Sequence, residues 1–142
     1  MGNLFEVNDT YSSQLERLKE PSDWYDVIGD FGLGEAEVLE LEDSWPLWQE
    51  ALKNEVSAIK YLFTGSYHPS QNAGGDPAVG YIDSATVSAI SDIFQSTERG
   101  EFEAILAKTG FSPEHDIWLY SELKSFFYGV KSRNSAILIL LT

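Results

Sequence analysis

The residue types best suited to chemistry lie in one polar stretch, residues 64–78, between two apolar ones. Ser66, His68 and Asp76 are the components of a hydrolase triad, in which a histidine activates the serine and an acid orients the histidine. The stretch lacks the Gly-x-Ser-x-Gly elbow that exposes such a nucleophile. Serine, asparagine, aspartate and glycine are also the usual residues of turns. We therefore expect a connecting loop here and no catalytic residue.

Metal, phosphate and thiol chemistry also lack their sequence patterns. His68 and His115 are the only histidines, they do not form a His-x-x-x-His or His-Glu-x-x-His motif, and the chain has no cysteine. The glycine pair at 74–75 has no Lys-Ser or Lys-Thr partner, and the acids of 35–43 do not follow the calcium-loop pattern. Two carboxylates brought together by folding, as in a glycosidase, have no sequence signature and remain an open alternative. We expect no enzyme activity, no metal and no cofactor.

Charge is the strongest feature of the composition. The chain carries a net charge of −14, and the acid-rich segment Glu20–Leu52 holds no Lys or Arg. Its ten acids are Glu20, Asp23, Asp26, Asp30, Glu35, Glu37, Glu40, Glu42, Asp43 and Glu50. Such a field repels phosphate backbones and anionic membranes, which argues against nucleic-acid or membrane binding, and it attracts a basic protein surface. The alternative is a solubilising face that has no partner.

Aromatic residues interleave with these acids. Tryptophan and tyrosine anchor interfaces, while carboxylates steer a basic partner. Trp48 falls on an apolar helical stripe, so we expect it in the core, whereas both environments remain open for Trp45. The expected partner-binding residues are Asp26, Asp30, Phe31, Glu35, Glu37, Glu40, Glu42, Asp43 and Trp45.

The elements that must position these residues indicate an α+β fold. With 142 residues and 43 % hydrophobic side chains, residues 1–142 fit a single domain. We expect a helix-rich domain with a small mixed sheet that contains the N- and C-terminal strands. The predicted strands are 4–7, 79–82 and 136–141, the last a central strand because its apolar run is continuous. The predicted helices are 10–19, 22–28, 45–63, one capped by Asp83 or Ser84, one from about Glu98 and one from Ser112. Residues 38–41 fit either a strand or a helical turn.

We expect no targeting signal in this sequence. The first residues lack the basic start and long apolar run of a signal peptide, and the longest apolar run, Ala136 to Leu141, is too short to span a bilayer. We expect a cytoplasmic protein that is a monomer or a small homo-oligomer.

Several short motifs occur in a characteristic order: MGNLFEV, YLFTG (Tyr61 to Gly65), a loop with Asn and Gly-Gly, a Gly-Tyr strand, a helix opened by Asp-Ser, and a hydrophobic helix followed by Asn and AILILL. This order resembles the YfbM-like family of small bacterial α+β proteins, a domain of unknown function. The resemblance implies no established reaction, and some members resemble toxin-immunity proteins by genomic context. Family members commonly carry a Trp-His pair where this chain has Val56 and Ser57, a second His where it has Lys60, and Gly-Pro-x-Arg where it has residues 80–83. Any polar pocket that those residues build in the family is therefore not carried over.

Two functions follow from these observations. The first is a non-enzymatic immunity protein that binds and occludes a basic toxin or effector domain. The second is a housekeeping YfbM-like protein that binds a small molecule, or acts as an enzyme, in a pocket beside the 64–78 loop. Its ligand-binding residues would be His68, Asn72, Asp76 and Tyr81.

Overall fold

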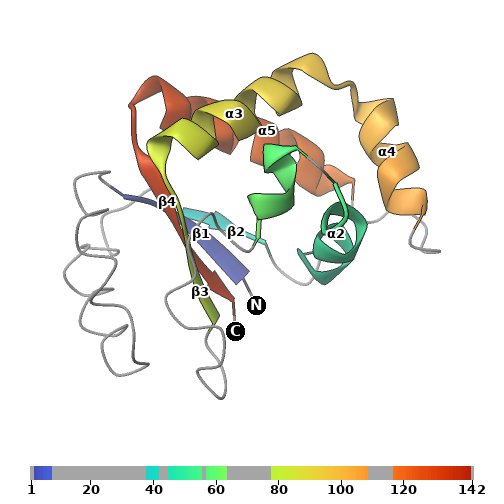
Figure 1. Cartoon of the computed structure of the whole chain (residues 1–142), viewed down its shortest axis with the longest axis horizontal. Coiled ribbons are helices and arrows are strands. Elements are labelled where there is room, and N and C mark those ends of the chain that lie inside the picture. The colour runs from blue at the N-terminus through green and yellow to red at the C-terminus, as the bar shows by residue number, and fades with distance from the viewer. Residues whose placement is uncertain are drawn as a thin grey trace.

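One four-stranded sheet brings the two ends of the chain together (Figure 1). The computed structural model describes residues 2–7, 38–41, 45–55, 57–63, 78–108 and 117–141. Strands β1 (Gly2–Val7), β2 (Val38–Glu40), β3 (Ala78–Ile82) and β4 (Ala136–Leu141) lie in the order β2-β1-β4-β3. Gly2 pairs with Leu141, so β1 and β4 are neighbours along their whole length. The α+β class and the inclusion of both terminal strands are confirmed.

The direction of the strands differs from our expectation of a mixed sheet. All three pairings are antiparallel, because β4 runs opposite to both of its neighbours, β1 and β3, and β2 runs opposite to β1. Residues 38–41, for which strand and helix were both open, form β2 and the residue after it.

The central position of β4 explains its unbroken apolar sequence. Ile137 and Ile139 are fully buried in the main core, together with Leu4 of β1 and Ile82 of β3. Leu138 points to the opposite face of the sheet and is also fully buried. A strand buried on both faces needs apolar residues at every position, so the prediction of a central strand is confirmed.

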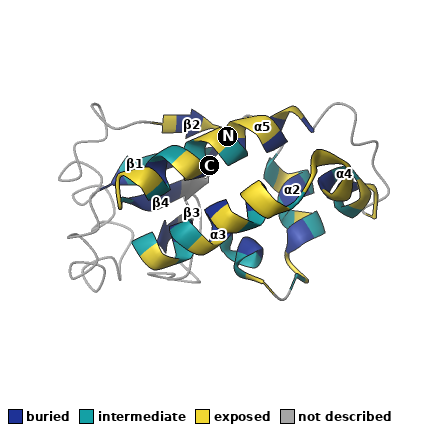
Figure 2. Ribbon diagram, turned by 90° about the horizontal axis from the view of Figure 1, so that it is seen from above, coloured by how far each residue is buried: buried dark blue, intermediate teal, exposed yellow. Residues whose placement is uncertain are grey.

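The described helices all lie to one side of this sheet (Figures 1 and 2). They are α2 (Trp45–Leu52), the 3₁₀ helix η2 (Ala58–Tyr61), α3 (Ser84–Ser96), α4 (Arg99–Ala107) and α5 (Trp118–Ser132). An aromatic cluster joins them: the rings of Phe94 and Phe102 stack with their centroids 5.0 Å apart, and Phe102 also contacts Trp48 and Tyr120. None of the helices in the described part of the chain is long and apolar enough to cross a membrane.

Two helix ends follow signals that the sequence carries locally. Asp83 precedes α3 and its carboxylate accepts a 2.8 Å hydrogen bond from the backbone N–H of Thr86, as predicted for a cap. Asn134 ends α5 with a φ of 52°. The N–H of Asn134 donates to the carbonyl of Lys131 and that of Ser135 to the carbonyl of Val130, which is a Schellman motif. This turn directs the chain into β4.

The prediction of one continuous helix over 45–63 is wrong. Helix α2 ends at Leu52, a turn follows at 53–54, and Ser57 precedes η2 in an extended conformation. Asn54 and Ser57 are residue types that favour turns and caps over helix interiors, which explains the break. The apolar period continues through it because Leu52 and Ile59 both reach the same core. Of the other predicted elements, the helix from about Glu98 is observed as α4, whereas 10–28, 64–77 and 112–116 lie outside the described residues.

Candidate functional site

Two of the nine predicted partner-binding residues fall within the described part of the chain. Glu40 ends β2 and is exposed, and Trp45 opens α2. The remaining seven lie outside the described residues: Asp26, Asp30, Phe31, Glu35, Glu37, Glu42 and Asp43. The same holds for His68, Asn72 and Asp76 of the small-molecule alternative and for His115.

The three described aromatic candidates differ in burial. Trp48 is fully buried in the aromatic cluster, which confirms its expected place in the core. Trp45 is half-buried and packs against that core. Tyr81 is 1 % exposed on β3, where it pairs with Leu138.

Strand β2 presents an edge of the sheet. The N–H of Leu41 donates to the carbonyl of Gly2 at 2.8 Å, so the backbone of Leu41 faces β1. Alternate residues of a strand share one direction, so the polar backbone groups of Leu39 also face β1 and those of Val38 and Glu40 face outward. Among the described residues, no strand pairs with this outer edge. Val38 is 45 % exposed, which is high for a valine in a sheet.

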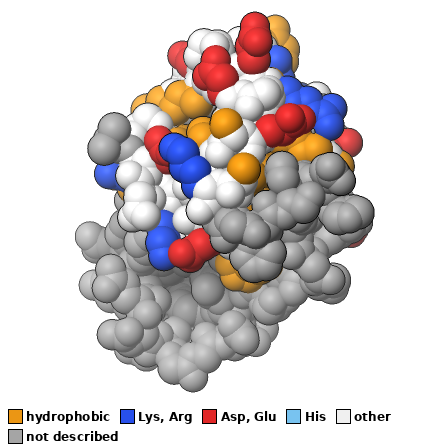
Figure 3. Space-filling view, turned by 90° about the vertical axis from the view of Figure 1, so that its right-hand side faces the viewer, with side chains coloured by type: hydrophobic (Ala, Val, Ile, Leu, Met, Phe, Trp, Pro, Cys, Tyr) orange, Lys and Arg blue, Asp and Glu red, His pale blue; other side chains and the backbone are white. Residues whose placement is uncertain are grey.

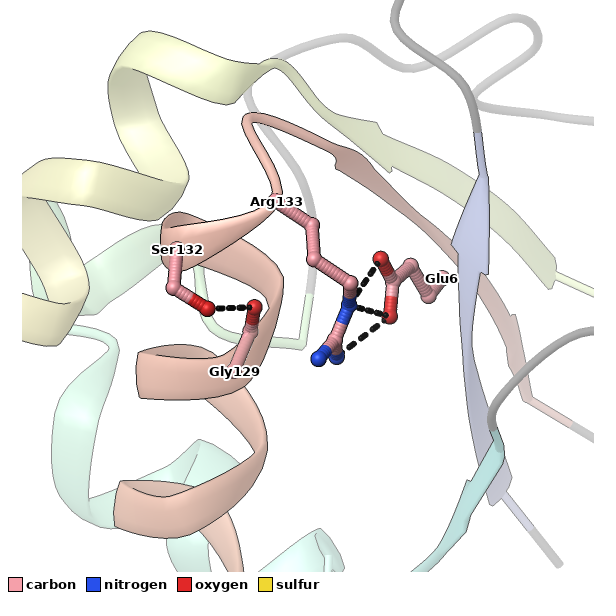
Figure 4. Close-up of polar contacts among 4 residues, drawn as sticks. All are labelled: Glu6, Gly129, Ser132 and Arg133. Atoms are coloured by element: carbon pink, nitrogen blue, oxygen red, sulfur yellow. Dashed lines mark hydrogen bonds and ion pairs between the residues drawn. The ribbon is translucent and has the colours of Figure 1, made fainter.

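A second polar arrangement joins β1 to the end of α5 (Figure 4). The Nε of Arg133 donates to both carboxylate oxygens of Glu6, at 3.0 and 2.8 Å, and its Nη2 donates to Oε1 at 2.7 Å. The hydrogen bond from Arg133 lowers the pKa of Glu6 below its usual value of 4.5; burial opposes this, and Ser135 and the charge of Arg133 reinforce it. The Glu6 side chain is 11 % exposed. This pair ties β1 to the end of α5, and it favours the charged form of Glu6.

A small depression lies between α3 and α5. It has a volume of about 200 Å³ and is lined by Gln95, Lys124, Ser125 and Tyr128. The Lys124 amine lies 5.7 Å from the centre of the Tyr120 ring, and Tyr128 is 58 % exposed. Its described lining residues combine one cation with neutral hydroxyl and amide groups, without a carboxylate or a histidine among them. Such a set can donate hydrogen bonds to a small polar group.

Charges on the described surface are mixed. The described residues hold ten of the 23 acids and seven of the nine bases, which leaves most of the net charge of −14 to the rest of the sequence. Acidic, basic and apolar side chains are interspersed on the face shown in Figure 3. Three exposed pairs, Glu50–Lys53, Arg99–Glu103 and Asp92–Lys131, contribute to this mixture. Within the described ranges, no group of three His, Cys, Asp or Glu residues is arranged to hold a metal ion.

These features define an α+β protein with a four-stranded antiparallel sheet and helices that lie to one side of it. The chain has the YfbM-like fold. It is similar to the crystal structure of YfbM from Escherichia coli, a protein of unknown function, with a TM-score of 0.66 and 16 % sequence identity over 99 % of each chain. No protein-family model and no curated protein matches the chain. The family resemblance expected from the sequence is thus confirmed at the level of the fold.

Sequence reasoning missed two features of this surface. The Glu6–Arg133 pair joins residues 127 positions apart, so no local pattern could indicate it. The outward edge of β2 was detectable in part, because the glycines and acids around Val38 mark a short, exposed segment.

Proposed function

We propose that this YfbM-like protein is a non-enzymatic binding protein that recognises a basic surface of another protein. The observation that carries the proposal is the distribution of charge: ten acids and no Lys or Arg between Glu20 and Leu52. Long-range attraction by such a segment raises the association rate with a basic partner, and nearby aromatic residues then contribute buried area. Glu40 and Trp45, the two described contact candidates, are both accessible to solvent.

The more specific form of this proposal is an immunity protein. The partner would be a basic toxin or effector domain, and binding would occlude its active site. The toxin step rests on charge complementarity alone, since the fold neighbour is a protein of unknown function. Inhibition of the partner's activity is therefore tested separately from binding.

The test compares two variants of equal net charge. In the first, Glu35, Glu37, Glu40 and Glu42 become Lys; in the second, Glu55, Glu98, Glu101 and Glu122 become Lys. Each reversal adds two charges, so four of them take the net charge of both variants from −14 to −6. Binding of the most basic product of a neighbouring reading frame is measured by calorimetry at low salt. We expect the first variant to lose at least about tenfold in affinity and the second to change much less. Equal losses in both variants would contradict recognition by the acid-rich segment.

The second candidate is a housekeeping YfbM-like protein with a small-molecule site beside residues 64–78. The likeness to YfbM fits this candidate more directly than it fits toxin neutralisation, because it extends over 99 % of both chains and YfbM is a protein of unknown function. Its test is a thermal-shift screen of metabolites on the wild type and on a His68→Ala, Asp76→Ala variant. A metabolite that raises the Tm of the wild type alone supports this site. Equal shifts in both proteins would place the ligand elsewhere.

A further inference from the structure

We propose that the outer edge of β2 is the docking site for an extended basic segment of the partner, which adds to the sheet as a further strand beside β2. The inference rests on the proposed function, because it states how the basic partner is held. Strand addition of this kind supplies affinity through backbone hydrogen bonds and specificity through alternate side chains.

The backbone of β2 provides the hydrogen-bonding groups. The N–H of Leu41 donates to the carbonyl of Gly2 at 2.8 Å, so the backbone groups of Leu41 face β1. Because alternate residues of a strand face the same neighbour, the backbone N–H and C=O of Leu39 also pair with β1. Val38 and Glu40 therefore direct two N–H and two C=O groups away from the sheet. No other described strand lies on that side, because the order β2-β1-β4-β3 places β2 at the edge.

The side chains beside this edge indicate the chemistry of the added strand. Val38 and Glu40 project from the same face of the sheet, next to Phe5 and Asn3, with which they pair. Leu39 projects from the other face and is buried. A strand docked on β2 would thus place one residue opposite Val38 and a second, two positions along, opposite Glu40. An apolar residue and a Lys or Arg complement these positions.

Charge selects between a basic partner and a second copy of this chain. The sequence from Glu35 to Asp43 contains five acids and no Lys or Arg. Two copies paired through β2 would bring these acids together, which is unfavourable, whereas a basic segment neutralises them. The observations therefore favour a basic partner strand over self-pairing.

The test uses the peptide Lys-Thr-Val-Thr-Lys-Thr-Val-Thr-Lys, whose Lys and Val side chains share one face. Two forms of this peptide carry the same number of N-methyl groups. In one form the groups lie on Thr residues, and in the other form they lie on residues of the Lys/Val set. Only the residues that face β2 need their N–H groups. The Thr-methylated form can still pair with β2 through its Lys/Val residues, and it cannot stack on further strands. The form methylated in the Lys/Val set keeps the same charge but loses the pairing hydrogen bonds in the register that places Lys opposite Glu40.

We expect the Thr-methylated peptide to bind at least about tenfold more tightly than the other form. We also expect it to slow hydrogen exchange at the amides of Val38 and Glu40. Val38→Pro should reduce binding of the Thr-methylated peptide about tenfold, because it removes an outward N–H that β1 does not use. Glu40→Lys should weaken binding more than Glu122→Lys, which reverses an exposed acid on α5. The comparison of the two peptides uses the wild-type protein, so it stands even where a variant does not fold.

Three results would overturn the inference: equal affinity for both peptides, no binding of either, or a dimer that protects Val38 and Glu40 without peptide. Failure of the proposed function gives a different pattern. In that case the basic partner itself binds both four-residue reversal variants equally well. If the proposed function holds and only the docking mode is wrong, reversal of the four acids in the acid-rich segment weakens binding of the partner, while N-methylation has no effect on binding of the peptide.

Discussion

Arg133, which follows the last residue of α5, donates three hydrogen bonds of 2.7 to 3.0 Å to the carboxylate of Glu6 on β1. The two residues are 127 positions apart, so the contact fixes the end of α5 over the sheet. Glu6 is 11 % exposed and Arg133 52 % exposed. Removal of Arg133 therefore leaves a largely buried carboxylate without its charged hydrogen-bond donor. Breaking a fully solvated pair has no such cost, because water replaces the lost donor.

Arg133→Gln should lower the free energy of unfolding by about 1 to 2 kcal/mol, because Glu6 loses its charged donor while it remains mostly buried. The control is Lys131→Gln, which breaks the exposed pair with Asp92 and should cost less than about 0.5 kcal/mol. Urea unfolding followed by circular dichroism measures both. If Lys131→Gln lowers the free energy of unfolding as much as Arg133→Gln does, the Glu6–Arg133 pair contributes no more to stability than an exposed pair.

The contribution of Glu6 should depend on pH. Its pKa is lowered in the folded protein, so the unfolded chain binds the proton more readily. The stabilisation is then complete above the unfolded pKa of 4.5 and disappears as the pH falls through the lower folded pKa. The stability difference between the wild type and Glu6→Gln should shrink below about pH 4. A difference that stays constant from pH 7 to pH 3 would contradict this assignment.

Gly129 should report on the same contact. A Cβ atom at this position would lie 2.9 Å from the Nη2 of Arg133. In the wild type, Gly129→Ala should change stability little, because the helix gain of about 1 kcal/mol is offset by displacement of the guanidinium. In an Arg133→Gln background the same change should stabilise by about 1 kcal/mol. Equal effects in the two backgrounds, measured as a double-mutant cycle, would contradict the proposed coupling.

Helix capping at Asp83 offers a test with an internal control. Asp83→Ala should cost about 1 kcal/mol, since the carboxylate bonds the N–H of Thr86 at 2.8 Å. Glu98 occupies the corresponding position before α4 without a side-chain hydrogen bond, so Glu98→Ala should cost less than about 0.5 kcal/mol. Thermal unfolding of the two variants gives the comparison, and equal losses would remove the assigned role of the cap.

Asn134 marks the turn that leads into β4. Its φ of 52° favours glycine or asparagine, so Asn134→Ala should cost about 1 kcal/mol and Asn134→Gly should be nearly neutral. The reverse order in an unfolding experiment would show that the asparagine side chain, and not the backbone conformation, holds the turn.

Local signals predicted much of this fold. Asp83 before a helix, Asn134 after one, and the unbroken apolar run of β4 each state their role within a few residues, because caps, turns and buried strands depend on nearby chemistry. The 45–63 segment shows the limit of periodicity. Trp48, Leu52 and Ile59 keep a helical spacing although the chain turns at 53–54, since burial against a common core preserves the pattern.

The candidate site was less predictable. Glu40 could be selected from its acidic neighbourhood, but its position at an open sheet edge depends on the pairing of β2 with β1, which brings together residues more than thirty positions apart. The prediction of a mixed sheet was wrong for the same reason, because the relative direction of the strands depends on how β4 returns beside β1 from the far end of the chain.

The central claim, recognition of a basic partner by the acid-rich segment, is tested most directly by the salt dependence of binding. The dissociation constant of the partner is measured from 50 to 400 mM NaCl for the wild type and for the two four-residue reversal variants. We predict a steep loss of affinity with salt for the wild type and for the Glu55, Glu98, Glu101 and Glu122 variant, and a shallow one for the Glu35, Glu37, Glu40 and Glu42 variant. Identical slopes for the two variants would contradict the account.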